Sequence, residues 1–143
     1  MTLYKTEYGP IHGGGPCRDD YNNIELYDQG EKGWPVLKLQ RPAIKSLKEV
    51  EERWAKLTRP WKKRRHVRVT GTWRSCAYQK ELYESDNNRY APPDKTLHTR
   101  GLAIDIHTGF LPDVLLFRIL RNHGWYQTRP ADEPWHWSFR LIG

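Results

Sequence analysis

The sequence predicts a small α+β domain in which helices pack on one face of a mainly antiparallel sheet. Three observations predict it. The chain has 143 residues, close to the roughly 150 of a common single domain. Three segments alternate apolar and polar residues, and two others repeat apolar residues at intervals of three and four. These segments interleave without a repeating unit, so we expect one domain over residues 1–143.

The N-terminal part predicts loop, then a short strand, then a helix. Residues 1–35 are rich in Gly, Pro, Asn and Asp, which favours an ordered, loop-rich segment packed on the domain. A short strand is expected at Val36–Leu39. From Pro42 to about Thr58 an amphipathic helix is expected, with proline suited to its first turn. Its apolar stripe is Ala43, Ile44, Leu47, Val50, Trp54 and Leu57.

The middle of the chain predicts a strand and a short helix. The basic run Lys62–Arg65, most simply a solvated charge run, leads into residues 67–74. There Val67, Val69 and Trp73 alternate with polar residues, so this strand has one apolar and one wet face. Ser75 is a suitable N-cap for a helix over 76–84. A polar, proline-containing loop over 85–95 follows.

The C-terminal half predicts a strand, a helix and a last strand. Alternation over 102–107 indicates a strand that carries polar residues on one face. Residues 112–113 open a helix that Gly124 ends. The strand over 135–142 places Trp135 and Trp137 on its apolar face, where we expect core positions, and His136 on the other. Function is therefore expected on the polar faces of the strands, opposite the helices.

Composition narrows the class of protein. Lys and Arg number 24 against 17 Asp and Glu, which gives a formal charge of +7 and a pI near 9.5. Polyanions are therefore plausible partners. The chain has 7 Trp, 8 Tyr and 3 Phe, enough large apolar side chains to build a core. No apolar run approaches the length of a membrane-spanning helix, so we expect no membrane span.

The cysteines and the N-terminal residues bear on the compartment. Cys17 and Cys76 are too few for a disulfide-dense scaffold and lack the paired spacing of a zinc knuckle. We expect two free thiols, with one long-loop disulfide as the alternative. The first ten residues lack the apolar centre of a secretory signal. A role outside the cell would then need another route of release.

Four residues together predict a catalytic metal site. Catalytic zinc is commonly held by three nitrogen or oxygen ligands, and a nearby carboxylate takes a proton from the attacking water. His98, Asp105 and His136 supply such ligands, and Glu133 supplies the carboxylate. The set is patterned: His98 and Asp105 share one short segment, and Glu133 precedes His136 in Glu-Pro-Trp-His. A His-Glu-x-x-His zinc protease is excluded because that string does not occur.

Small residues lie between the first two candidate ligands. Gly101 and Ala103 would leave room where metal and substrate approach the backbone. His107 follows Asp105 by two residues, but a fourth protein ligand would close the site. We therefore expect a polar surface position for His107, or a role beside the ligands or the substrate.

These motifs resemble those of a known family. Residues 96–105, Thr-Leu-His-Thr-Arg-Gly-Leu-Ala-Ile-Asp, and residues 133–136 are similar to the zinc D-alanyl-D-alanine carboxypeptidases of the vancomycin-resistance type. That superfamily also contains the L-alanyl-D-glutamate peptidases that phages use as endolysins. A third family motif matches Trp73-Arg74-Ser75 and Gln79. The three motifs occur in the family's order over about half the chain.

The resemblance implies a hedgehog/D,D-peptidase-like fold and a role for each matched residue. One Zn2+ ion would be held by His98, Asp105 and His136, with Glu133 as general base and later proton donor. Arg74 would bind substrate and stabilise the oxyanion, a role that a guanidinium near the carbonyl oxygen also allows on physical grounds. Substrate binding would also involve Gln79 and Thr96; the family commonly has serine at the latter position. The expected substrate is the peptidoglycan stem peptide.

Several functions remain open on the sequence alone. We favour a D-alanyl-D-alanine carboxypeptidase-like zinc peptidase, with an L-alanyl-D-glutamate endolysin as the alternative. A zinc-binding module without catalysis is the non-enzymatic alternative, although Glu133 argues against it. Specific nucleic-acid binding is not expected, because no recognised basic helix, finger or stacking platform is evident.

Location and assembly are expectations of the same hypothesis. We expect a monomer that is made in the cytoplasm and acts on the cell wall, after release in host lysis or as part of a virion. Its positive charge would hold it on the anionic cell-wall surface.

Overall fold

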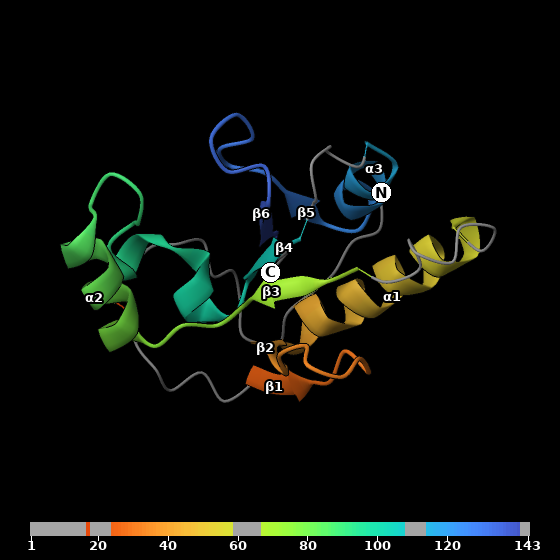
Figure 1. Ribbon diagram of the computed structural model, residues 1–143, viewed down its shortest axis with the longest axis horizontal. Coiled ribbons are helices and arrows are strands. Elements are labelled where there is room, and N and C mark those ends of the chain that lie inside the picture. The colour runs from red at the N-terminus through yellow and green to blue at the C-terminus, as the bar shows by residue number, and fades with distance from the viewer. Residues whose placement is uncertain (1–16, 18–23, 59–66, 108–113, 141–143) are drawn as a thin grey trace.

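The computed structural model describes residues 17, 24–58, 67–107 and 114–140, and these form an α+β domain (Figure 1). The predicted fold class is confirmed. The helices are α1 (Arg41–Leu57), α2 (Cys76–Ser85) and α3 (Val114–Asn122), with single 3-10 turns η2 (Pro93–Lys95) and η3 (Leu97–Arg100). The strands are β1 (Ile24–Tyr27), β2 (Leu37–Gln40), β3 (Val69–Gly71), β4 (Ala103–Ile106), β5 (Trp125–Tyr126) and β6 (His136–Phe139).

The strands form two antiparallel sheets. The larger one has the order β3-β4-β6-β5, and the smaller one pairs β1 with β2. The central pair places Asp105 opposite His136 and Ala103 opposite Ser138. This register sets two candidate metal ligands side by side on neighbouring strands.

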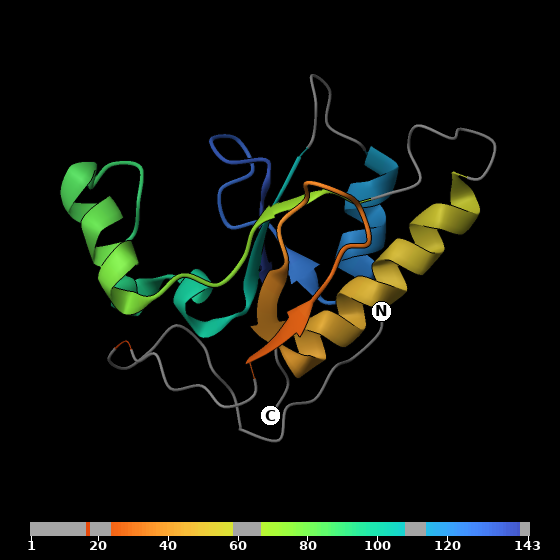
Figure 2. The same cartoon turned by 60° about the horizontal axis from the view of Figure 1, so that its bottom comes forward.

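Helices α1 and α3 share one hydrophobic core with the strands. As the spacing predicts, α1 buries Ala43, Ile44, Leu47, Val50 and Trp54, while Leu57 at its end is partly exposed. The fully buried Leu120 of α3 and Trp137 of β6 belong to the same cluster. In both views of the ribbon, α2 lies on the other side of the strands from α1 and α3 (Figure 2).

A disulfide bond joins Cys17 to Cys76, the first residue of α2. The expectation of free thiols is therefore wrong, and the alternative holds. The two residues are 59 positions apart in sequence, yet the fold brings their Cα atoms to 6.0 Å. The Cys17 backbone N–H also donates a hydrogen bond of 2.7 Å to Asp94 Oδ1. Because Gln79 is the one buried residue of α2, this cross-link is a major attachment of the helix.

The structure also differs from the sequence prediction in the strands. It adds β1 and the two-residue β5, and it shortens the strand predicted over 67–74 to Val69–Gly71. Trp135, expected in the core, is 37% exposed because β6 begins one residue later. The basic run Lys62–Arg65, most of the segment 1–35 and the ends of the predicted elements at 112–113 and 141–142 lie outside the described residues.

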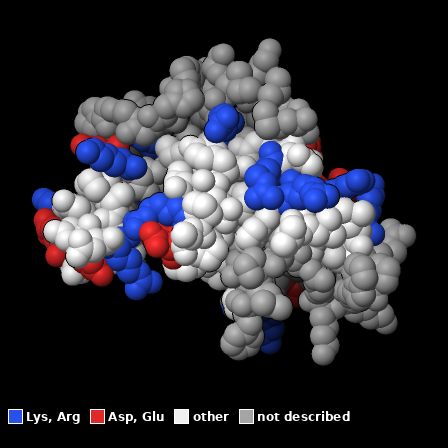
Figure 3. All heavy atoms as spheres, turned by 90° about the horizontal axis from the view of Figure 1, so that it is seen from above, with Lys and Arg blue, Asp and Glu red and all other residues white. Residues whose placement is uncertain are grey.

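The surface carries more basic than acidic side chains. On the face drawn in Figure 3, Lys and Arg cover more of the surface than Asp and Glu, in line with the formal charge of +7. Among the helices of the described residues, none is long and apolar enough to cross a membrane.

Candidate metal centre and its pocket

The turn η3 holds His98 in a fixed orientation. The hydroxyl of Thr96 caps the turn by accepting a hydrogen bond from the His98 backbone N–H at 3.3 Å. His98 is 3% exposed, and its ring Nδ1 lies 2.7 Å from the carbonyl oxygen of Thr72. A carbonyl only accepts hydrogen bonds, so Nδ1 carries the proton and Nε2 keeps a lone pair for a metal.

Strand pairing brings the other two candidate ligands to the same point. Asp105 on β4 and His136 on β6 are register partners, and the distance from Asp105 Oδ1 to His136 Nδ1 is 3.1 Å. On the far side of the His136 ring, Nε2 lies 3.4 Å from the Ser138 hydroxyl. Ligation through Nδ1 leaves the ring proton on Nε2, where the Ser138 oxygen accepts it.

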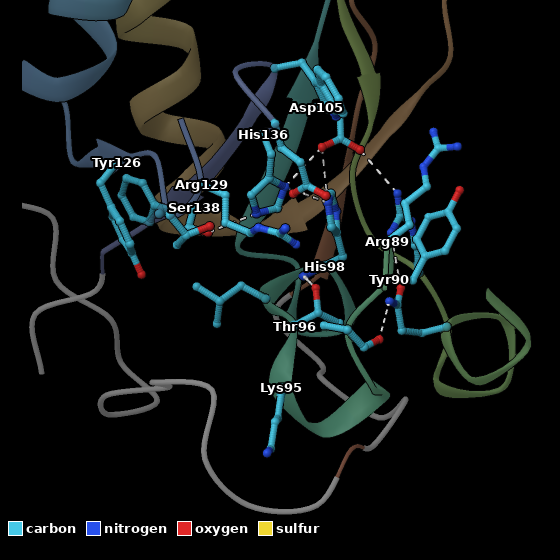
Figure 4. A pocket seen from close by; sticks show the side chains of 18 of the residues that line it. Arg89, Tyr90, Lys95, Thr96, His98, Asp105, Tyr126, Arg129, His136 and Ser138 are labelled. Carbon is cyan, nitrogen blue, oxygen red and sulfur yellow. Dashed lines mark hydrogen bonds and ion pairs between the residues drawn. The ribbon is translucent and has the colours of Figure 1, made fainter. Parts of the chain in front are cut away.

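The three ligand atoms form a nearly equilateral triangle (Figure 4). His98 Nε2 lies 3.2 Å from His136 Nδ1 and 3.3 Å from Asp105 Oδ1, and the third side is 3.1 Å. Tetrahedral zinc with bonds of about 2.0–2.1 Å separates its ligand atoms by about 3.3 Å. Two imidazole nitrogens and one carboxylate oxygen also suit zinc chemically. The residues present therefore fit a zinc ion with one coordination position left open.

The electrostatics keep two of these ligands in the form that binds a metal. Burial alone would raise the pKa of Asp105, but hydrogen bonds with His136 and His98 outweigh it and hold that pKa far below its usual range. Burial lowers the pKa of His98 more than the neighbouring Asp105 carboxylate raises it. At neutral pH the carboxyl is therefore ionised and the His98 imidazole is neutral.

Arg74 joins the candidate metal ligands to the wall of the pocket. Its Nη2 donates to Asp105 Oδ2 at 3.2 Å, and its Nη1 donates to Gln79 Oε1 at 3.2 Å. Gln79 is 1% exposed, and its Nε2 donates to the Ala91 carbonyl at 2.8 Å. The Gln79 side chain thus holds Arg74 in place. Asp105 contacts the guanidinium through Oδ2 and both histidines through Oδ1.

Glu133 lies in the turn that leads into β6. Its backbone N–H donates to the Arg129 carbonyl at 2.8 Å, and the His136 N–H donates to the Glu133 carbonyl at 3.1 Å. These bonds fix the position of Glu133 three residues before the ligand. Among the described residues, the group able to hold a metal contains the three ligands without Glu133.

All seven site residues predicted from the sequence line one pocket of about 500 Å³. It extends to both sides of the metal ligands: Arg89 and Tyr90 lie at one side, and Tyr126 and Arg129 at the other (Figure 4). Its lining is strongly basic. The cationic residues are Arg74, Arg89, Lys95, Arg129 and Arg140, and the acidic ones are Asp105 and Glu133.

The small residues of the motif serve packing, which corrects the expectation for Gly101 and Ala103. Gly101 ends η3 with φ of 69°, and a Cβ there would come within 2.3 Å of the Ile24 side chain. Ala103 is fully buried in β4. A different glycine leaves room at the site: a Cβ on Gly71 would lie 3.1 Å from Asp105 Oδ2.

Comparison with solved structures identifies the fold. An LD-carboxypeptidase, LdcB, matches 87% of this chain and 72% of its own, with a TM-score of 0.60 and 17% identity. The vancomycin resistance D,D-pentapeptidase VanY in complex with Zn(II) matches 96% of this chain and 86% of its own, with a TM-score of 0.55 and 18% identity. The chain has the fold of these peptidases. The D,D-dipeptidase VanXYg, in complex with a D-Ala-D-Ala phosphinate analog, is similar at a TM-score of 0.56 and 20% identity. That match covers 96% of this chain and 61% of VanXYg.

Comparisons by sequence find no relative of this chain. No protein-family model matches the chain, and no curated protein matches it. The likeness that the comparisons show is thus one of fold.

Sequence reasoning missed two groups that orient the ligands. The Thr72 carbonyl is a backbone atom, so no residue type signals it, and it meets His98 only through the fold. Ser138 follows His136 by two residues on the polar face of the predicted strand, and that alternation is the one signal that could have found it. His107 is exposed and stands outside the metal-binding group of the described residues.

Proposed function

We propose that this protein is a zinc-dependent peptidase that hydrolyses a peptide bond of the peptidoglycan stem peptide. The observation that carries the proposal is the triangle of His98, Asp105 and His136 ligand atoms, with sides of 3.1–3.3 Å, on the polar side of a fold shared with cell-wall peptidases. A purely structural zinc site has four protein ligands, whereas this one has three within a wide pocket.

The residues divide the chemistry between them. A zinc ion in this position supplies a Lewis acid for the scissile carbonyl and lowers the pKa of water. Glu133 accepts a proton from the attacking water and passes it to the departing amine nitrogen. Arg74, held by Asp105 and Gln79, directs its remaining N–H groups towards the negative charge that develops on the carbonyl oxygen.

The bond we favour is that between the terminal D-alanines, because the motifs resemble D-alanyl-D-alanine carboxypeptidases. VanYB has been solved in complex with D-alanine-D-alanine, at 18% identity to this chain. The second candidate is the L-alanyl-D-glutamate bond of a phage endolysin. The pocket supports it by extending to both sides of the metal ligands (Figure 4), as an enzyme that cuts within a peptide requires.

The basic surface gives this small enzyme a means of reaching its substrate. We propose that long-range attraction holds it on the anionic cell wall as a monomer, after release from the cytoplasm or as part of a virion. Binding to purified cell walls should then weaken as salt is raised. Binding that is independent of salt would contradict this.

A digest tests the enzymatic proposal. Purified protein loaded with one equivalent of zinc is incubated with peptidoglycan of several types, and the products are analysed by mass spectrometry. Loss of terminal D-alanine supports the carboxypeptidase, and a new D-glutamate amino terminus supports the endopeptidase. A zinc-loaded protein that releases no fragment from any type would leave the non-catalytic zinc module as the better description.

The variant Glu133→Gln is the matched test of the mechanism. It keeps the side chain's size and removes its basicity, so we expect hydrolysis to fall at least 100-fold with unchanged zinc content. Hydrolysis close to that of the parent protein would remove Glu133 from the mechanism.

A further inference from the structure

The pocket continues beyond the metal ligands to a second cationic site on the extension of β6. Arg140 follows His136 and Ser138 at intervals of two, so all three lie on the same face of the chain. Its backbone N–H donates to the Gly124 carbonyl at 2.9 Å, which continues the hydrogen bonding of β6 with the preceding chain. Both Arg140 and the neighbouring Tyr126 line the pocket.

The Arg140 guanidinium is oriented by an aromatic ring. Its central carbon lies 4.9 Å from the centroid of the Tyr126 ring, a distance typical of a cation–π contact. A guanidinium held over a ring can still donate from the N–H edge of its planar fork. That edge matches the two oxygens of a carboxylate.

The charge of Arg140 is also available, unlike that of two other arginines of the pocket. Arg74 is paired with Asp105 at 3.2 Å and Arg129 with Asp132 at 3.1 Å. Arg140 has no ion-pair partner within the described part of the chain. A carboxylate from outside would therefore meet an oriented cation with no competing carboxylate among the residues that the structure describes.

The distance to the metal ligands limits where that carboxylate stands in a substrate. Four residues of strand separate the Cα atoms of His136 and Arg140 by about 13 Å. The arginine side chain shortens the gap to roughly the length of two extended peptide residues. The group that Arg140 binds is thus within about two residues of the scissile carbonyl.

We propose that Arg140, stacked on Tyr126, binds a free carboxylate of the substrate and makes the pocket selective for stem peptides whose D-glutamate carries a free α-carboxylate over amidated ones. The inference rests on the proposed function for its substrate class. It applies to the favoured terminal D-alanine bond, where D-glutamate lies two residues before the D-alanine that carries the scissile carbonyl. At the L-alanine bond, D-glutamate lies on the opposite, carboxyl-terminal side of the scissile carbonyl.

Binding to two synthetic stem pentapeptides tests the proposal. They are identical except that the D-glutamate α-carboxyl is free in one and a carboxamide in the other. Zinc-loaded protein carrying Glu133→Ala, which prevents turnover, is titrated with each peptide by calorimetry. We expect the free acid to bind about tenfold more tightly, and Arg140→Gln to abolish that difference.

The matched control is Arg118→Gln, which removes the same charge from an exposed position on α3 outside the pocket. It should leave the preference intact. Equal binding of the two peptides by the parent, or a preference that persists in Arg140→Gln, overturns the inference. Hydrolysis by the protein with Glu133 intact is measured separately. If neither peptide is cut, the proposed function fails while the binding comparison still decides the role of Arg140.

Discussion

Removing the disulfide should destabilise the protein by about 4 kcal/mol. Cys17 and Cys76 enclose a loop with a sequence separation of 59. In the chain-entropy description, closing a loop of that length removes about 14 cal/mol/K from the unfolded chain, which is about 4 kcal/mol at 25 °C. The loss is large beside the roughly 5–15 kcal/mol of a typical domain. The lost stability should affect mainly helix α2, because Gln79 is its one buried side chain.

Urea unfolding of metal-free protein measures this effect, because a thiol reductant could otherwise bind zinc. The free energy of unfolding is compared for oxidised protein, reduced protein and the double variant Cys17→Ser, Cys76→Ser. The reduced protein and the double variant should agree with each other, and reductant should not change the double variant. A difference of less than about 1 kcal/mol between oxidised and reduced protein would refute the loop-entropy reasoning.

Three other changes test single contacts of the structure. Gln79→Met keeps the side-chain volume but removes the hydrogen bonds to Arg74 and the Ala91 carbonyl. We expect a loss of about 2 kcal/mol of stability and a fall of about tenfold in kcat, with KM less affected. Gln79→Glu should not restore kcat, because the positioning of Arg74 requires the neutral amide. Ser138→Ala removes the acceptor behind His136 and should weaken zinc binding about tenfold in a competition titration; unchanged affinity would contradict this role. Burial and a hydrogen bond to a carboxylate raise the pKa of Tyr27, so the folded state keeps the phenol proton longer than the unfolded state does. The contribution of Tyr27 to stability is therefore fully present below a pH of about 10 and decreases above it. Tyr27→Phe should make that decrease smaller when the free energy of unfolding is measured by urea titration at increasing pH.

Much of the fold and of the metal site follows from local patterns. The apolar stripe of α1 extends over 17 residues, long enough for its periodicity to identify a helix without help from the rest of the chain. The candidate ligands were identified because two imidazoles, a carboxylate and a nearby glutamate form a chemically complete set. Pairing of β4 with β6 brings Asp105 beside His136, while His98 reaches the same pocket from η3.

The remaining features depend on contacts between distant segments. Strand β5 has two residues, too few for alternation to appear, and it exists because it pairs with β6. Cys17 and Cys76 carry no local signal of their distance. The sequence predicted a need for a small residue at Gly101 but placed that need at the metal site. The structure places it at Ile24, 77 positions earlier, whose side chain occupies the space of a Cβ.

The pairing of Asp105 with His136 across β4 and β6 ties two candidate ligands to the backbone ladder. The connection between β5 and β6, from Gln127 to Trp135, lies outside that ladder. Loops at the edge of a sheet accept insertions far more readily than strands do, so residues added between Thr128 and Asp132 would reshape one wall of the pocket without moving the metal ligands. A one-residue slip of β6 would instead turn His136 into the core. Changes in the length of this loop can thus alter substrate preference, while the register of β4 and β6 keeps the metal ligands in place.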